Sequence, residues 1–355
     1  MTTLALVSDA WHPQVNGVVR TLDTTRNELE KLGITVKMIT PEKYSTVPMP
    51  TYPEIRLAVT WPNRIHRALE KADPDFVHIS TEGPLGIVAR RWCRRRDFGY
   101  TTSYHTRFPE YLRARIPFPL SWSYAFVRSF HNAGVGCMIS NATLERELSS
   151  RGFRNLMHWI RGVDTEAFNP DVPPALPDLP RPVFIYVGRV SVEKNIEAFL
   201  GLDLPGTKLV VGDGPAKAAL EARYPDAVFV GSKSGRDLTA HYTSADVFVF
   251  PSLTDTWGLV QMEALACGVP VAAFPTMGPI DVIADSGTGI LDNDLRRAAL
   301  EALKIPRERC RAYSLDFSWD VSAKQFVENL HIANDTRNAA RARKAARAGK
   351  SARAA

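Results

Sequence analysis

Short apolar runs rich in β-branched residues alternate along this chain with longer segments that repeat apolar residues at helical spacing. In the first half, LALVS (4–8), ITVKMIT (34–40) and DFVHIS (75–80) predict strands, and TLDTTRNELEKLG (21–33) predicts a helix. Strands that alternate with helices at this spacing indicate βαβ units and parallel sheets.

A second series of the same kind follows after a proline-rich break. Its expected strands are PVFIYVG (182–188), KLVVGDG (208–214), AVFVG (227–231), DVFVFPS (246–252) and VPVAAF (269–274), with helices expected at PAKAALEARY (215–224) and LVQMEALACG (259–268). The break, residues 169–182, holds six prolines in fourteen positions and cannot continue a helix or a central strand.

These patterns predict an α/β protein with two doubly wound, Rossmann-like domains, residues 1–168 and 169–312. We expect residues 313–335 to be helical and to pack back on the first domain. The last twenty residues, 336–355, are basic and lack large apolar side chains, so we expect a disordered tail. Because open parallel sheets bind ligands beyond the carboxyl ends of their strands, both domains should contribute loops to a cleft.

Composition narrows the protein class. With 355 residues, 45% of them hydrophobic, the chain has enough apolar residues for two cores. Its four cysteines lack CxxC spacing, which argues against a disulfide framework and fits a reducing cytoplasm. The N-terminal residues are typical of a first strand and lack the basic leader of a signal peptide. No apolar run approaches the roughly 20 residues of a membrane span, so we expect a soluble or peripheral protein.

The net charge of +6 is unevenly distributed. Residues 1–165 are net +7 and residues 336–355 are net +7, while residues 166–335 are net −8. We therefore expect the first half to face something anionic. The densest cluster comprises Arg90, Arg91, Arg94, Arg95 and Arg96. A solvated helix face explains this cluster equally well. A nucleic-acid-binding protein is a further alternative, but no recognition motif accompanies the charge, and we expect no nucleic-acid partner.

Glycines and cations follow several expected strands. Gly17 precedes a helix after the first strand, and Gly212 and Gly231 end later strands, where a ligand could approach the backbone. Gly188 is followed by Arg189 and then by Lys194 at a helix start. An Arg fork and a Lys point charge beside helix N–H groups suit a diphosphate. Simple tight turns and structural salt bridges are the alternatives.

The order of these motifs resembles a known family. In order along the chain there are GR..VEKN (188–195), VGDGP (211–215) and D.FVFPS (246–252), followed by Asp255, seven residues and Glu263 before ALACG. This order resembles the retaining glycosyltransferases of the GT-B fold, which use nucleotide-sugar donors. The resemblance spans residues 4 to 330. Four further stretches resemble the branch with bacterial mannosyltransferases and enzymes that glycosylate diacylglycerol: TEGPLG (81–86), SYHTRFPEY (103–111), RGVD..AFNP (161–170) and TDTWG (254–258).

This resemblance implies roles for the matching positions. Arg189 and Lys194 would bind the diphosphate of a UDP- or GDP-sugar, Glu263 its ribose hydroxyls, and Asp255 the hydroxyls of the transferred sugar. His105 would lie near the reacting sugar; a core histidine is the alternative. The other implied donor-binding positions are Gly17, Gly188, Gly212, Gly231, Gly258, Leu259 and Val260. Those implied to bind the acceptor are Asn16, Glu82 and Arg107.

The chemistry expected of this site needs neither a cofactor nor a metal. Fixed cations stabilise the negative charge that develops on a departing diphosphate, and the sequence has no Asp-x-Asp pair at a strand end. The family is thought to retain configuration by a front-face route in which the departing phosphate accepts the acceptor's proton. Asp255 departs from the family, which usually has Glu there, so the sugar does not follow from the resemblance. Asp is shorter by roughly 1.5 Å.

A membrane lipid such as diacylglycerol is the expected acceptor. Residues 107–130 interleave arginines with Phe, Tyr and Trp, which suits the interface of an anionic membrane, and the basic clusters add attraction. A helix with aromatics in the core is the alternative. We expect the protein to be peripheral on the inner face of the plasma membrane. The competing functions are a GDP-mannose-dependent α-mannosyltransferase with a glycan acceptor and, outside this class, a nucleotide-sugar epimerase.

Overall fold

The computed structural model describes residues 2–14, 17–49, 52–113 and 118–354. The chain forms two compact units, the first made of residues 1–160 and 322–355 and the second of residues 161–321. The sequence places the boundary at 168/169, whereas the contacts place it eight residues earlier. The physical reason is that the Val163 N–H donates to the carbonyl of Phe317, and Phe168 joins the core of the second unit.

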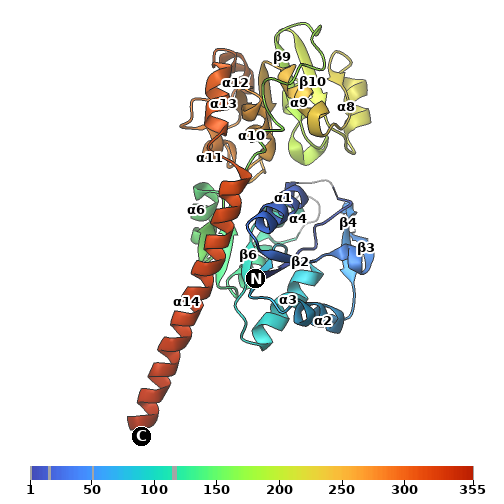
Figure 1. The fold of residues 1–355 in the computed structure, drawn as a ribbon. Helices are drawn as coiled ribbons and strands as arrows, with labels where there is room; N and C mark the ends of the chain where they lie inside the picture. The colour runs from blue at the N-terminus through green and yellow to red at the C-terminus, as the bar shows by residue number, and fades with distance from the viewer. Residues whose placement is uncertain (1, 15–16, 50–51, 114–117, 355) are drawn as a thin grey trace. The chain divides into compact units, whose positions relative to one another are not determined.

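The first unit is built on a parallel sheet (Figure 1). In spatial order its strands are β2 (Thr35–Ile39), β1 (Thr3–Val7), β5 (Phe76–Ile79), β6 (Thr101–Ser103), β7 (Gly136–Ile139) and β8 (Leu156–His158). Alternate residues of β1 enter different cores, Ala5 and Val7 one, Leu4 and Leu6 another. Both faces of the strand are therefore buried, which explains its uninterrupted apolar sequence.

Helices and one hairpin surround this sheet. The helices are α1 (Gly17–Lys31), α2 (Pro62–Ala72), α3 (Pro84–Arg95), α4 (Phe108–Arg113), α5 (Leu120–His131) and α6 (Ala142–Ser150). A short 3₁₀ turn, η1 (Pro41–Lys43), leads into the antiparallel hairpin of β3 (Ser45–Met49) and β4 (Tyr52–Val59). In the described residues, β3 and β4 form a two-stranded sheet of their own, separate from the parallel sheet.

The second unit repeats the plan with another parallel sheet. Its strands, in spatial order, are β11 (Val228–Phe229), β10 (Thr207–Val211), β9 (Val183–Val187), β12 (Val247–Phe250), β13 (Val271–Ala273) and β14 (Gly289–Leu291). Its helices are η2 (Val192–Lys194), α7 (Glu197–Leu200), α8 (Lys217–Arg223), α9 (Gly235–Thr243), α10 (Leu259–Ala266), α11 (Pro279–Ile283), α12 (Leu295–Ala302) and α13 (Arg307–Ser314). The strand order is the Rossmann order, with the reversal between β9 and β12.

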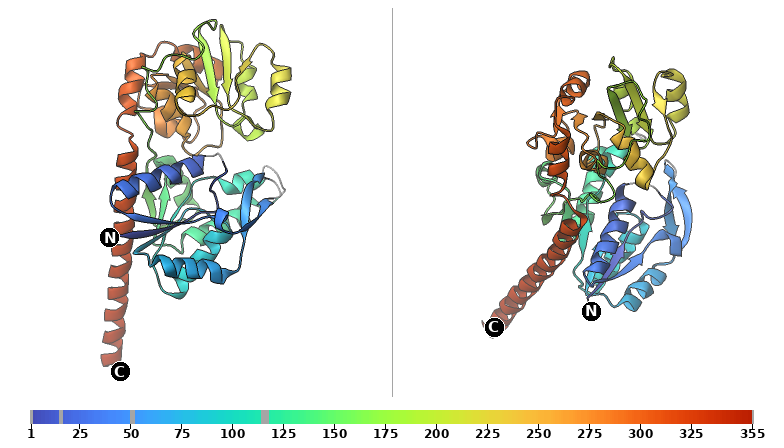
Figure 2. Two further views of the ribbon diagram at one scale, coloured as in Figure 1. Left: turned by 45° about the vertical axis from the view of Figure 1, so that its right-hand side comes forward. Right: turned by 45° about the horizontal axis from the view of Figure 1, so that its top comes forward.

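The last helix, α14 (Trp319–Ala354), joins the first unit from Ser322 onward (Figure 2). Phe326 and Leu330 enter the core that contains Leu4 and Leu6, and the Trp159 indole donates to Ser322 Oγ at 3.1 Å. Helix α14 is continued through Ala354, and the disorder expected over 336–355 stays a prediction. Ala, Arg and Lys are strong helix formers, and extending a docked helix avoids the cost of nucleation.

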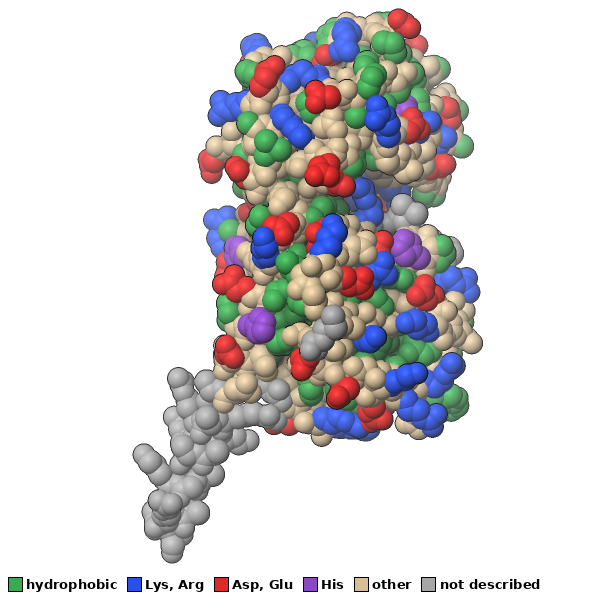
Figure 3. Space-filling view, viewed as in Figure 1, with side chains coloured by type: hydrophobic (Ala, Val, Ile, Leu, Met, Phe, Trp, Pro, Cys, Tyr) green, Lys and Arg blue, Asp and Glu red, His purple; other side chains and the backbone are tan. Residues whose placement is uncertain are grey.

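Basic side chains gather over helices α2 and α3 on the face shown in Figure 3. On α3 and directly after it, Arg91, Arg94, Arg95 and Arg96 are exposed, while Trp92 and Cys93 between them are buried. The arginine cluster is therefore the outer face of an amphipathic helix. In the described part of the chain, no helix combines the length and the apolar character that a membrane crossing requires.

Candidate active site

Two loops of the second unit meet where its strand order reverses. β9 is followed by Gly188, Arg189 and η2, and the neighbouring β12 is followed by residues 251–258. The side-chain amide of Asn195, directly after η2, donates to the carbonyl of Pro251 at 3.0 Å and fastens one loop to the other. Such a switch point is where open α/β sheets bind ligands.

Lys194 and Asp255 form an ion pair across these loops, with 2.5 Å between Nζ and Oδ1. Their side chains are 24% and 18% exposed, so both are partly screened from water. Burial alone raises the pKa of Asp255, but the Lys194 charge and the nearby Ser252 hydroxyl outweigh it, so the pKa lies below its ordinary value. The second oxygen, Oδ2, is buried and accepts no hydrogen bond of normal geometry from the described residues. The carboxylate is thus charged and has capacity to accept a ligand hydroxyl.

The predicted glycine turns lie side by side at the carboxyl ends of β9, β10 and β11. The Gly188 N–H donates to the carbonyl of Val211, and the Gly212 N–H donates to the carbonyl of Gly231. A Cβ added to Gly212 would lie 1.8 Å from the Gly188 carbonyl oxygen. No side chain fits at that distance, so Gly212 is required by the close approach of the two loops.

Glu263 lies in α10, which begins at Leu259 directly after Gly258, as the sequence predicts. Its side chain is buried, and its Oε2 accepts a hydrogen bond from the Tyr242 hydroxyl at 3.0 Å. Gly258 has a left-handed backbone with φ of 78°. A Cβ there would lie within 3.0 Å of Gln261 and Phe250 atoms, so glycine permits this entry into the helix. Leu259 and Val260, in the first turn of α10, are half-buried.

Arg189 is exposed, in contrast to the half-buried Lys194. Its carbonyl oxygen accepts a hydrogen bond from the Tyr186 hydroxyl at 2.7 Å, which fixes the backbone of the loop. The geometry of the second unit therefore brings Lys194 and Asp255 together, while Arg189 on the same loop is an exposed residue.

In the first unit, His105 lies on the loop between β6 and α4. The preceding Tyr104 is fully buried, and its N–H donates to the carbonyl of Met138 on the next strand. The His105 ring is half-buried and meets the buried Trp159 ring edge-on at 5.9 Å. His105 is thus at a strand end, as the sequence predicts, with one side of its ring against the core.

Glu82 is paired with the buried His131. His131 Nε2 lies 2.9 Å from Glu82 Oε1, and Nδ1 lies 2.9 Å from the Thr102 hydroxyl. Burial alone lowers the pKa of His131, but its neighbours Cys137 and Glu82 outweigh burial and raise the pKa to about 10. In the imidazolium form, Nε2–H donates to Glu82 and Nδ1–H donates to the Thr102 hydroxyl, so both contacts are hydrogen bonds. Glu82 therefore has one oxygen engaged by the protein.

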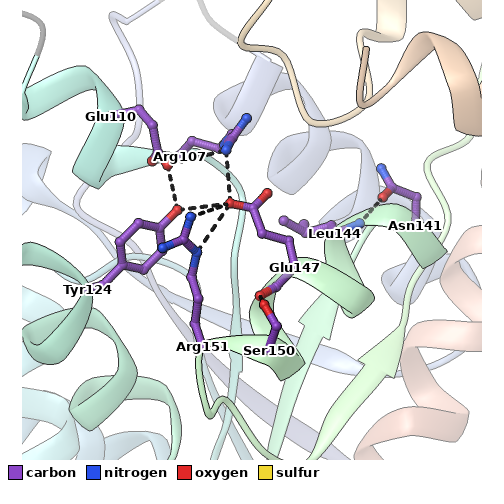
Figure 4. Close-up of polar contacts among 8 residues, drawn as sticks. All are labelled: Arg107, Glu110, Tyr124, Asn141, Leu144, Glu147, Ser150 and Arg151. Atoms are coloured by element: carbon purple, nitrogen blue, oxygen red, sulfur yellow. Dashed lines mark hydrogen bonds and ion pairs between the residues drawn. The ribbon is translucent and has the colours of Figure 1, made fainter. Parts of the chain in front are cut away.

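Arg107 lies in a network of charged side chains on helices α4, α5 and α6 (Figure 4). Its Nη2 is 2.9 Å from Glu147 Oε1 and 3.3 Å from Glu110 Oε1. The Tyr124 hydroxyl donates to Glu110 at 2.6 Å. Burial by itself lowers the pKa of Arg107, and the two carboxylates raise it above its ordinary value. The role of Arg107 in acceptor binding remains a prediction, and its guanidinium is already paired within the protein.

Gly17 begins α1, and a Cβ added there would meet no atom within 4 Å. The described part of the protein therefore does not require glycine at this position by packing. Asn16, predicted beside it, lies outside the described residues.

Sequence reasoning missed Asp9, two residues after β1. Its carboxylate is buried and accepts hydrogen bonds from the N–H groups of Leu85 and Gly86 and from the Thr81 hydroxyl. It thereby caps the start of α3. A Cβ on Gly83 would lie 2.4 Å from Asp9 Cγ, which accounts for one glycine of the TEGPLG stretch. Burial raises the pKa of Asp9 to about 6, against the opposing effect of these hydrogen bonds. The sequence does carry a sign of Asp9, since it is an acidic residue directly after the expected strand 4–8.

Two Rossmann-like parallel sheets, with glycine turns and charged residues at their strand ends, define the GT-B class of glycosyltransferases. Solved structures agree on the fold. A sucrose-phosphate synthase from Thermosynechococcus elongatus superposes with a TM-score of 0.69 at 20% identity, covering 92% of this chain and 98% of that one. Anabaena HepE, solved with UDP and glucose, gives a TM-score of 0.71 at 15% identity, covering 93% of this chain and 100% of the other.

Sequence relatives give the family. Residues 15–167 match the model of Glycosyltransferase Family 4, and residues 171–305 match Glycosyl transferases group 1. A GDP-mannose-dependent alpha-mannosyltransferase of Mycobacterium tuberculosis is 30% identical over 81% of this chain and 83% of its own length. The alpha-monoglucosyldiacylglycerol synthase of Streptococcus pneumoniae is 26% identical over 92% and 84%. The chain belongs to these glycosyltransferases and is itself a glycosyltransferase, which disfavours the epimerase alternative.

Proposed function

We propose that this glycosyltransferase moves a hexose from a UDP- or GDP-sugar to a membrane lipid such as diacylglycerol, with retention of configuration and without a metal or other cofactor. The observation that carries the donor side is the Lys194–Asp255 pair at the switch point of the second unit. A bound diphosphate would take the Lys194 ammonium as its partner, and a sugar hydroxyl would donate to Asp255.

The chemistry follows from these charges. Cleavage of the bond between the sugar and the diphosphate leaves negative charge on the departing phosphate oxygen. A fixed ammonium group in a partly dry site stabilises that charge more than water does. Arg189 would add a second cation, Glu263 would accept the ribose hydroxyls, and His105 would orient the reacting groups. In the front-face route the departing phosphate accepts the proton of the acceptor hydroxyl, so no protein nucleophile is needed.

Helix α5 supports a membrane-bound acceptor. Trp122 and Phe126 on the helix and Phe118 just before it are exposed. Tyr124 and Phe130 are buried, so the aromatic residues divide between surface and core. Trp122 is 68% exposed. Basic residues adjoin this surface, because Arg90 of α3 donates to the carbonyl of Ser129 on α5 at 2.9 Å. Exposed rings beside arginines suit an anionic bilayer, with about 1 kcal/mol of attraction for each basic residue near it.

The relatives support two acceptor classes. The diacylglycerol glycosyltransferase named above favours a lipid acceptor. The GDP-mannose-dependent mannosyltransferase named above favours GDP-mannose as donor, with a glycan as the alternative acceptor. The exposed stripe on α5 favours the lipid.

A thermal-shift screen of UDP- and GDP-hexoses tests the proposal. At a hundredfold excess over its Kd, the true donor stabilises the fold by about 2.7 kcal/mol. The donor found in this way is then incubated with vesicles that contain diacylglycerol, with and without EDTA, and the anomeric configuration of the product is determined by NMR. If no nucleotide sugar raises the melting temperature, the donor class is wrong. Inhibition by EDTA or an inverted product would contradict the metal-free, retaining reaction.

A further inference from the structure

Glu147 of helix α6 is the centre of the charged network in the first unit (Figure 4). A single oxygen, Oε1, accepts from Arg107 Nη2 at 2.9 Å and from Arg151 Nη2 at 3.1 Å. It also lies 3.3 Å from the Tyr124 hydroxyl oxygen, whose proton is donated to Glu110. These partners come from the start of α4, the end of α6 and the middle of α5. One carboxylate therefore fastens three helices together.

The network is built to be rigid and largely dry. Asn141 caps α6 by accepting from the Leu144 N–H at 2.7 Å, which fixes the helix that carries Glu147. The side chains of Arg107, Glu110 and Glu147 are only 19% to 22% exposed. The Arg151 guanidinium lies 4.0 Å from the centre of the Tyr124 ring. Two carboxylates balance two guanidinium groups, so removing one partner leaves a partly buried charge uncompensated.

Arg107 connects this network to the loop that carries His105. The loop is only four residues long, from Tyr104 to Arg107, and each end is anchored. Tyr104 is buried and bonded to β7 at one end, and Arg107 is bonded to Glu147 at the other. Only Thr106 separates His105 from Arg107, so a displacement of the Arg107 backbone is passed on to His105.

We propose that Glu147 is a positioning residue for transfer, holding Arg107 and through it the His105 loop in the geometry the reaction uses. The kinetic part of this inference rests on the proposed role of His105. The structural part, the dependence of the His105 environment on Glu147, stands by itself.

The variant Glu147→Gln removes the charge and keeps the size. The matched control is Glu145→Gln on the same helix, because the Glu145 carboxylate pairs instead with His158, with 2.7 Å between Oε2 and Nε2. In protein labelled with ¹³C at histidine Cε1, the His105 signal is assigned with His105→Gln. We expect Glu147→Gln to move the His105 signal and Glu145→Gln to move the His158 signal instead.

Kinetics supply the second readout. A misplacement near one ångström costs roughly 100-fold in rate, so kcat for transfer should fall between about 10- and 100-fold in Glu147→Gln, with the donor KM within about twofold. Arg107→Gln should reproduce this loss, and Arg107→Lys, which keeps the charge, should restore part of it. If Glu147→Gln folds poorly, Arg107→Gln and Arg107→Lys still test the positioning role.

The outcomes separate the two claims. An unmoved His105 signal in both Glu147→Gln and Arg107→Gln overturns the positioning role, whatever the activity. An equal loss of kcat in Glu145→Gln overturns it as well, since a general weakening of α6 would then suffice. If the unaltered chain transfers no sugar while the His105 signal still follows Glu147, the proposed function fails and the structural part of the inference is upheld.

Discussion

The Lys194 ammonium lies 2.5 Å from the Asp255 carboxylate, although the two residues are 61 positions apart in the chain. Each follows a strand of the second sheet, and the strands are neighbours where the order reverses. The pair keeps Asp255 charged despite its burial. The free protein thus holds together the two groups to which the proposed function assigns different parts of the donor, the diphosphate to Lys194 and the sugar to Asp255.

Glu263 and Asp255 should have separable effects on binding. Glu263→Ala should weaken both free UDP or GDP and the donor sugar by roughly 10- to 100-fold, because a hydrogen bond to a charged group contributes about 1.5–3 kcal/mol. Asp255→Ala should leave binding of the free nucleotide within about threefold and abolish transfer. Calorimetric titrations with nucleotide and with donor measure both effects. Equal losses for the two ligands in each variant would contradict this division.

Asp9 should make the stability depend on pH. Its pKa rises from 3.8 to about 6 on folding, so its protonated form is favoured in the folded chain. The corresponding stability, about 3 kcal/mol, is complete below pH 3.8 and is lost as the pH rises through 6. Relative to the unaltered protein, Asp9→Asn should therefore gain stability between pH 4 and 7 in urea unfolding. Parallel pH profiles of the two proteins would show that Asp9 does not titrate in this range.

Gly212 and Gly17 should respond differently to the same substitution. Gly212→Ala places a Cβ 1.8 Å from the Gly188 carbonyl oxygen, so the free energy of unfolding should fall by at least roughly 1–3 kcal/mol. Gly17→Ala meets no atom within 4 Å and should change stability by less than about 0.5 kcal/mol. If Gly17 lets the donor approach the backbone, Gly17→Ala should lower the affinity for the donor and leave stability unchanged. Thermal unfolding with and without the donor separates a loss of stability from a loss of donor affinity. A Gly212→Ala protein as stable as the unaltered chain would refute the steric argument.

The exposed aromatics of α5 should contribute to vesicle binding. Trp122→Ser with Phe126→Ser should lower the affinity for anionic vesicles by at least about tenfold, since burying one such ring is worth about 1.5–3 kcal/mol. The melting temperature should change little, because both rings are exposed. Trp61→Ser, at an 81% exposed tryptophan outside α5, is the control. Sedimentation with vesicles at low salt measures the effect, and an equal loss in the control would exclude a specific surface on α5.

Much of the fold was readable from local pattern. The expected strand at 182–188 matches β9, and the expected helix at 259–268 matches α10 within two residues. These elements are strongly marked because most of their residues are buried and a glycine adjoins each of them. The spacing of Asp255 and Glu263 likewise follows from one short segment that enters a helix at Gly258. Local sequence holds the information for such features.

Features that depend on distant neighbours were not readable in this way. Helical spacing places Trp122 and Phe126 on one face of α5, but whether that face meets solvent or the core depends on what packs against α5.

The sequence by itself determined the alternation of strands and helices, the glycine turns and the family. The tertiary structure alone decided which charges meet. Lys194 reaches Asp255, Asp9 caps α3, and Glu147 receives Arg107 because parallel strands bring together loops that the chain separates by tens of residues. An ion pair of this kind leaves no local pattern, since each partner by itself resembles any polar residue in a loop or on a helix surface.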